Sequence, residues 1–197
     1  MEAAFALVGV WTLLLVAPEL AARIGEGAAL LCVYAAATVL LLATRSRSAA
    51  PLGASPRVLV VGWTAGCVSY PAWVAVAWLV GQVSGLPPHP GGPSGAATPG
   101  AWLAVLFLAP AFEELLYRER LLDALRIRLG APAAVAASSA LFALPHAEPW
   151  HITATALVGL GLGALRCAGA PLAACMALHA GLNAAAWLAV RAPATRS

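Results

Sequence analysis

Residues 101–118 read AWLAVLFLAPAFEELLYR and place two adjacent carboxylates, Glu113 and Glu114, at the end of a long apolar run. The preceding stretch from Val58 to Phe112 contains no Asp, Glu, Lys or Arg. An ionisable side chain at membrane depth costs about 2.5 kcal/mol or more, so it should face a partner inside a helix bundle. The polar candidates in the later apolar segments are His146, His179 and Asn183.

The composition is that of an integral membrane protein. Of the 197 residues, 62% are hydrophobic and only 10% are charged, and the mean hydropathy is +0.87. Soluble domains are about 45–50% apolar and about 25% charged. At roughly 20 residues a span, this length allows about seven transmembrane helices with short loops and no soluble domain. We therefore predict an all-α fold, a polytopic transmembrane helical bundle of about seven spans.

The boundaries of the apolar segments define the expected spans. Pro18 and Glu19 should end the first, and Pro71 should kink the third. A Gly- and Pro-rich loop from Gln82 to Gly100 separates the front three spans, residues 1–100, from the rest of the chain. The expected spans are Ala3–Val16, Ala28–Ala43, Val58–Val80, a fourth from Ala101, Ala133–His146, Ile152–Leu165 and Pro171–Val190.

Two further features come from this pass along the chain. Gly159, Gly161 and Gly163 give the sixth span a GxxxG spacing suited to close helix packing. Glu148 and His151 are expected in a turn outside the bilayer, because Pro149 lies between them.

The distribution of arginine predicts the orientation. With the N-terminus inside and seven alternating spans, eight Arg lie on the inner side and three on the outer side. This asymmetry favours a cytoplasmic N-terminus by the positive-inside rule. We expect a multi-pass protein of the cell (plasma) membrane. Because the Arg residues lie between spans rather than in one patch, the expected partners include the lipid bilayer and no nucleic acid.

The two carboxylates need not have the same role. Glu114 and Arg118 are four residues apart and share a helix face, which predicts an ion pair. Glu113 lies about 100° away around the helix, on the side of Tyr117. Glu114 would then be held by Arg118 while Glu113 stays free for chemistry; the reverse assignment and joint action remain open.

The histidines and the asparagine lie at helical spacings. His146 follows Phe142 by four residues at the end of an apolar segment, which suits either an interfacial residue or a site residue. His179 and Asn183 are also four residues apart, among small and apolar neighbours, and so need partners inside the bundle. A plain helix–helix hydrogen bond is the structural alternative to a functional role.

Estimated depths test whether these side chains can meet. At about 1.5 Å per residue, Glu113 lies about 18 Å from the outer end of its span and His179 about 12 Å from the inner end of its own. These depths agree across a hydrocarbon core of about 30 Å. His146 comes out at about 20 Å, which a tilted or later-starting fifth span would correct.

The three patterns together resemble a known family. Glu113-Glu114-x-x-x-Arg118, Phe142-x-x-x-His146 and His179-x-x-x-Asn183 are similar to the motifs of the CPBP intramembrane proteases, the CAAX proteases and bacteriocin-processing enzymes also called the Abi family. The resemblance covers about Ala101 to Val190, so residues 101–197 are expected to be the catalytic membrane domain. The front half matches only in being hydrophobic.

The resemblance implies hydrolysis of peptide bonds in membrane-associated protein or peptide substrates by an activated water. Glu113 would be the general base, His146 would assist or bind a metal, and His179 and Asn183 would bind a metal or stabilise the oxyanion. Arg118 would hold Glu114 or the helix end. No HExxH sequence is present. Two arrangements stay open: a zinc site of Glu113, His146 and His179 with a water in the fourth position, or a metal-free Glu–His pair.

Two other classes of function compete with the protease. A non-catalytic membrane scaffold or regulator would keep the bundle and use the polar cluster only for packing. A small transporter would use the Glu and His groups to relay protons or bind substrate. The presence of all three motifs favours the enzyme over the scaffold, and the chain shows no matching halves of the kind found in many transporters.

Overall fold

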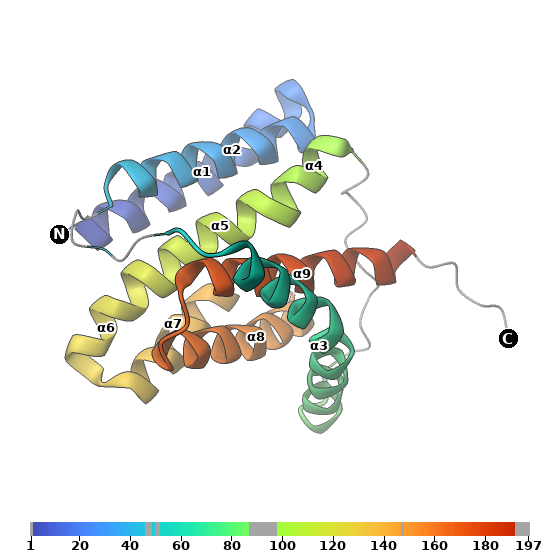
Figure 1. Ribbon diagram of the computed structural model, residues 1–197. Helices are drawn as coiled ribbons and strands as arrows, with labels where there is room; N and C mark the ends of the chain where they lie inside the picture. Colours follow the sequence, from blue (N-terminus) through green and yellow to red (C-terminus); the bar gives the residue numbers. More distant parts are fainter. Residues whose placement is uncertain (1, 46–48, 50–51, 87–97, 147, 192–197) are drawn as a thin grey trace, which may run out of the picture.

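The chain folds as a bundle of helices in a computed structural model that describes residues 2–45, 49, 52–86, 98–146 and 148–191 (Figure 1). The described part contains α-helices, π-helical turns and one 3-10 turn. The prediction of an all-α fold is therefore confirmed. The helices are α1 (Glu2–Ile24), α2 (Glu26–Ala43), α3 (Pro56–Val83), α4 (Pro99–Leu103), α5 (Ala109–Glu114), α6 (Leu122–Leu129), α7 (Ala131–Ala143), α8 (Pro149–Cys167) and α9 (Leu172–Arg191).

Helices α4, α5 and α6 form one continuous helix, Pro99–Leu129. Two π-helical segments, Ala104–Leu108 and Leu115–Leu121, join the three parts. Local sequence sets where the helix begins and ends. The Thr98 hydroxyl accepts a hydrogen bond from the Ala101 N–H, and Pro99 occupies the first turn, where a missing N–H is harmless. Gly130, with φ of 75°, ends the helix in a conformation that favours glycine.

Several predicted boundaries need correction. Helix α1 continues through Pro18 to Ile24, so this proline does not end it. Helix α8 begins at Pro149 and includes His151, which we had expected in a turn. The ends of the predicted Gln82–Gly100 loop belong to α3 and α4, and residues 87–97 lie outside the described part. The remaining predicted segments are helical, with ends within a few residues of their expected limits, as is usual for helix ends.

Within the described ranges, four helices are long and apolar enough to cross a membrane: Glu26–Ala43, Pro56–Val83, Pro99–Leu129 and Leu172–Ala189. This supports a multi-pass membrane protein. Ala131–His146 is apolar but shorter. The number of seven spans stays a prediction.

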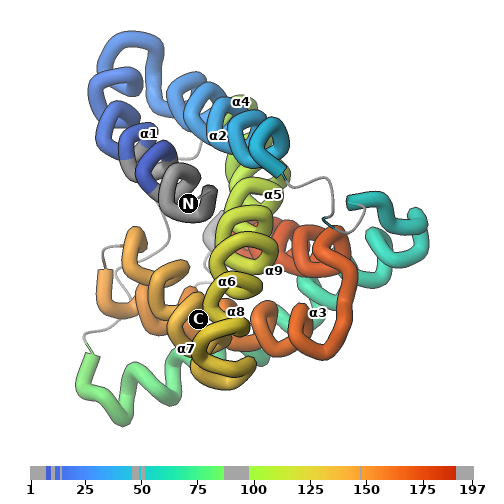
Figure 2. Tube along the Cα trace, turned by 90° about the vertical axis from the view of Figure 1, so that its left-hand side faces the viewer, coloured from blue at the N-terminus to red at the C-terminus, as the bar shows by residue number. Residues whose placement is uncertain are grey.

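The long helix α4–α6 lies at the centre of the arrangement. The α1–α2 hairpin packs along one side of it, and the α7–α8 hairpin and α9 lie on the other (Figures 1 and 2). Helix α3 crosses α9 at a steep angle and covers the side of α9 that faces away from the long helix (Figure 2). Helix α9 is thus held between α3 and α5.

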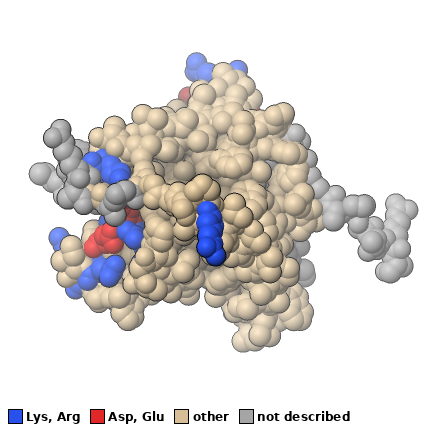
Figure 3. Space-filling model, viewed as in Figure 1, with Lys and Arg blue, Asp and Glu red and all other residues tan. Residues whose placement is uncertain are grey.

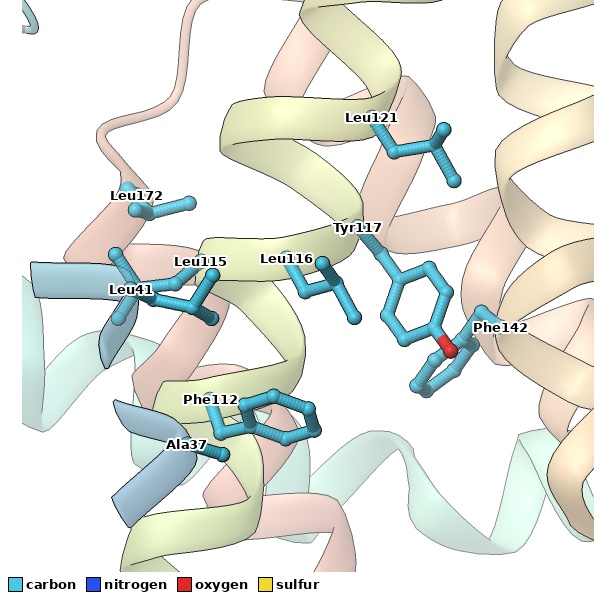
Figure 4. Close-up of a cluster of buried hydrophobic side chains, with 9 residues drawn as sticks. All are labelled: Ala37, Leu41, Phe112, Leu115, Leu116, Tyr117, Leu121, Phe142 and Leu172. Carbon is cyan, nitrogen blue, oxygen red and sulfur yellow. The ribbon is translucent and has the colours of Figure 1, made fainter. Parts of the chain in front are cut away.

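An apolar cluster surrounds the second π-helical segment. Its side chains come from α2, the long helix, α7 and the start of α9 (Figure 4). Inside a bilayer such contacts act through close packing, because lipid tails are as apolar as the side chains. The members are Ala37, Leu41, Phe112, Leu115, Leu116, Tyr117, Leu121, Phe142 and Leu172. This cluster fixes the part of the long helix that follows Glu113 and Glu114.

Glycines permit the closest helix contacts. On α8, a Cβ added at Gly159 would lie 3.0 Å from Ser139 Cβ, and one added at Gly163 would lie 3.1 Å from Val135 Cγ1, both on α7. The predicted packing role of this GxxxG spacing is confirmed. A second GxxxG, Gly62 and Gly66 of α3, lets the α3 backbone reach α9 and was missed by the sequence analysis.

We expect Gly66→Leu to destabilise the protein, because a side chain at this position would meet the Leu178 carbonyl oxygen of α9. Overpacking of this kind costs about 1–3 kcal/mol. The measurement is the midpoint of thermal unfolding in detergent micelles. Ala65→Leu is the matched control, since Ala65 is exposed on the same helix. Equal midpoints for the two variants would show that α3 does not pack on α9 in this way.

Candidate active site

The Glu pair lies at the end of a short α-helical stretch between two π-helical segments. Helix α5 covers only Ala109–Glu114, and each neighbouring segment has hydrogen bonds that span five residues instead of four. Such π-turns are rare and occur often at functional sites. They shift the faces of the long helix relative to a uniform α-helix, so the directions of Glu113 and Glu114 depend on both of them.

Glu114 is fully enclosed, and two partners hold one of its oxygens. Its Oε1 lies 3.0 Å from His179 Nδ1 and 3.3 Å from Arg118 Nη1. The predicted pair between Glu114 and Arg118 is therefore confirmed. A buried carboxylate needs such partners, since an isolated buried charge costs several kcal/mol.

Glu113 faces the other nitrogen of the same imidazole. Its Oε2 lies 3.5 Å from His179 Nε2, and its side chain is 15% exposed, against 0% for Glu114. A neutral imidazole donates one N–H and an imidazolium donates two. His179 therefore lies between an enclosed carboxylate on Nδ1 and a more accessible one on Nε2. The two carboxylates thus differ in exposure while they contact the same ring.

Arg118 is buried with the cluster. Its guanidinium carbon lies 4.2 Å from the centre of the Phe142 ring, a cation–π contact, and its Nη2 donates to the Gly159 carbonyl at 3.3 Å. The Gly159 carbonyl is a site contact that the sequence analysis missed. Its signal was the GxxxG spacing, which brings the backbone of α8 close to its neighbours.

Phe142 connects the three motifs. Its ring centre lies 5.6 Å from that of His179, 5.8 Å from that of His146 and 5.3 Å from that of Tyr117, each near edge-to-face. Figure 4 shows Phe142 beside Tyr117 at the edge of the apolar cluster. The Phe142 ring lies between Arg118 and the two histidines and so supports the site without taking part in a hydrogen bond.

His146 lies at the edge of the site. It ends the 3-10 turn after α7, is exposed, and has Nδ1 3.3 Å from the Ala143 carbonyl oxygen. In the described part of the chain, its link to the Glu–His cluster runs through the Phe142 ring rather than through a hydrogen bond or ion pair. The structure thus brings Glu113, Glu114, Arg118 and His179 together and leaves His146 one ring away.

Asn183 lies one turn beyond His179 on α9. Its Nδ2 donates to the Val105 carbonyl at 3.0 Å, inside the first π-helical segment. This contact is a helix–helix hydrogen bond, one of the two alternatives that the sequence left open. It uses one of the two N–H groups of the Asn183 amide.

A zinc site of Glu113, His146 and His179 does not fit this arrangement. Such a site needs three protein ligands about 2 Å from one ion. Glu113 and His179 meet, whereas His146 is linked to His179 through the Phe142 ring, whose centre lies 5.8 Å from the His146 ring and 5.6 Å from the His179 ring. Among the described residues, no three His, Cys, Asp or Glu side chains are placed to hold a metal ion. The mechanism below therefore uses no metal.

We expect Arg118→Met to destabilise the protein strongly, because it leaves Glu114 buried without its cation. Breaking a buried ion pair from one side costs about 3–5 kcal/mol. Thermal unfolding in nanodiscs measures the loss. Arg126→Met is the control, since Arg126 pairs with Asp123 at 3.8 Å with both side chains exposed. An Arg118→Met protein as stable as this control would contradict the buried pair.

Comparison with known proteins gives a match in the same half of the chain. Residues 95–185 match the model of a family described as type II CAAX prenyl endopeptidase Rce1-like. No curated protein and no solved structure matches the chain. The matched residues contain all three motifs and the whole Glu–His cluster, so the family predicted from these motifs is confirmed. Residues 95–185 are a domain of the Rce1-like type II CAAX prenyl endopeptidase family.

Proposed function

We propose that this protein is an intramembrane endopeptidase in which Glu113, oriented through His179, activates a water that hydrolyses a peptide bond. Membership of the family implies an intramembrane protease with a protein or peptide substrate. The observation that supports this mechanism is the position of His179, with a carboxylate on each ring nitrogen. The pattern of base, orienting group and enclosed acid is that of general acid–base catalysis.

The steps follow from the donors and acceptors present. Glu113 Oε2 takes a proton from the water, and the water oxygen forms a bond to the carbonyl carbon of the substrate. The tetrahedral intermediate then breaks its C–N bond, and the proton held by Glu113 goes to the leaving amine. Glu114 and Arg118 hold the His179 ring in place throughout. The more accessible side chain of Glu113 supports this division of roles.

His146 is proposed to act from the substrate side. It is exposed and lies across the Phe142 ring from His179, so a bound peptide would pass close to it. Asn183 donates one N–H of its amide to the Val105 carbonyl, and its second N–H is the donor that the oxyanion role suggested by the family resemblance would use.

We also propose the membrane arrangement that the sequence predicted. All seven helical segments would cross the membrane, counting α4–α6 as one, with the N-terminus in the cytoplasm and residues 101–197 forming the catalytic domain. The charged side chains visible in Figure 3 support this, since most of them gather at one end of the molecule, over α6 and near the N-terminus. The ion pair between Arg45 and Glu119 lies at this end.

The test uses the purified protein in nanodiscs with a diverse library of membrane-tethered peptides. We expect wild type to cleave a subset of them and Glu113→Gln to lose about 10²–10⁴-fold in rate, the usual contribution of a general base. Glu148→Gln is the control, because Glu148 is exposed and lies outside the cluster. Unchanged thermal unfolding would show that the loss is chemical.

Two outcomes would change the assignment. Full activity in Glu113→Gln would reject Glu113 as the base. If Glu114→Gln stayed folded and inactive while Glu113→Gln cleaved normally, the roles of the two carboxylates would be reversed.

A further inference from the structure

We propose that Asn183 is a positioning residue that supplies the hydrogen bond which Pro110 cannot give, and thereby fixes the direction of Glu113. The inference rests on the proposed function, since it assigns one N–H of the Asn183 amide to the shape of the helix that carries the base.

The first π-helical segment contains a carbonyl without a helical donor. In this segment the Ala109 N–H is bound to the Ala104 carbonyl, five residues earlier. By the same spacing, the Val105 carbonyl would accept from residue 110. That residue is a proline, which has no N–H. The Ala109 N–H, which would serve Val105 in an α-helix, is already engaged.

Asn183 provides the missing donor. Its Nδ2 donates to the Val105 oxygen at 3.0 Å from the facing helix α9. Inside a membrane bundle no water is present to donate a hydrogen bond to an unpaired carbonyl, so the protein must supply the donor. Asn183 is the only asparagine in the chain, and it faces the Val105 carbonyl, which lacks a helical donor.

The contact bears directly on Glu113. Helix α9 touches the long helix on both sides of Pro110: Asn183 meets Val105 before it, and His179 meets Glu113 after it. A π-turn holds one residue more than an α-turn. If the unpaired carbonyl let this turn close to α-helical form, Glu113 would rotate by about 100° away from its present direction. Asn183 therefore holds the turn that aims Glu113 at His179.

A measurement on wild type tests the contact without any variant. Protein labelled with ¹³C at the Val carbonyls and ¹⁵N at the Asn side chain carries a single labelled amide nitrogen, because the chain has one Asn. Dipolar recoupling by solid-state NMR in lipid should give a nitrogen–carbon distance of no more than about 4.2 Å, the 3.0 Å contact plus the carbonyl bond of about 1.2 Å. A distance well above this value would overturn the proposal.

Rescue by a second substitution tests the positioning role. We expect Asn183→Leu, which keeps the size but removes the donor, to lower kcat by about 10²-fold with little change in KM, because misplacement of a catalytic group acts on the chemical step. Pro110→Ala restores an N–H at residue 110. The double variant should therefore recover most of the activity and of the unfolding temperature lost by Asn183→Leu. Pro71→Ala, which restores an N–H inside α3, is the control and should rescue nothing.

The outcomes separate this proposal from the proposed function. If Pro110→Ala is active but the double variant stays as impaired as Asn183→Leu, Asn183 acts on the substrate directly and the proposal is overturned. If wild type cleaves no peptide, the proposed function fails, while the NMR distance and the rescue of unfolding temperature still decide the role of Asn183. If Asn183→Leu fails to fold, folding of the double variant supports the proposal, and its failure together with a long NMR distance overturns it.

Discussion

The need to satisfy two carboxylates inside a helix bundle governs the structure. Glu114 is enclosed, so its charge must be met by Arg118 from its own helix and by His179 from α9. Arg118 must in turn find partners, and it uses the Phe142 ring and the Gly159 carbonyl. These contacts draw α7, α8 and α9 around one point of the long helix. The same chain of contacts leaves Glu113 as the more open carboxylate, which is the feature that a hydrolytic site requires.

The front helices contribute support rather than chemistry. The Arg45 guanidinium, just beyond α2, donates to both carboxylate oxygens of Glu119, with the closest contact at 2.6 Å. Arg120 donates to the Leu41 carbonyl and to the Thr44 hydroxyl of the same region. These contacts hold the long helix at Glu119 and Arg120, the two residues that follow Arg118. The N-terminal half of the chain, which contains no motif, thus helps to hold the long helix that carries Glu113 and Glu114.

The sequence predicted those parts of the site that follow from a regular helix. The spacing of Glu114 and Arg118 gave their ion pair, and the spacing of His179 and Asn183 gave two contacts from one face of α9. It did not predict the π-turns, because helical patterns were assigned at 3.6 residues a turn throughout. The exposure of His146 fits the interfacial residue that was one of its two interpretations, and the 3-10 turn in which it lies was not predicted. The GxxxG spacing of Gly62 and Gly66 in α3 was not recognised, because apolar residues surround it.

The glycine contact between α3 and α9 makes the site sensitive to the bilayer itself. Helix α3 has 28 residues, a length of about 42 Å, whereas the hydrocarbon core is about 30 Å thick. A helix of this excess length adjusts its tilt to membrane thickness. Because Gly66 lies directly on the α9 backbone, and α9 carries His179, we expect a change in the tilt of α3 to act on the helix that carries the imidazole. The thickness of the bilayer would then be one of the conditions that set the geometry of the site.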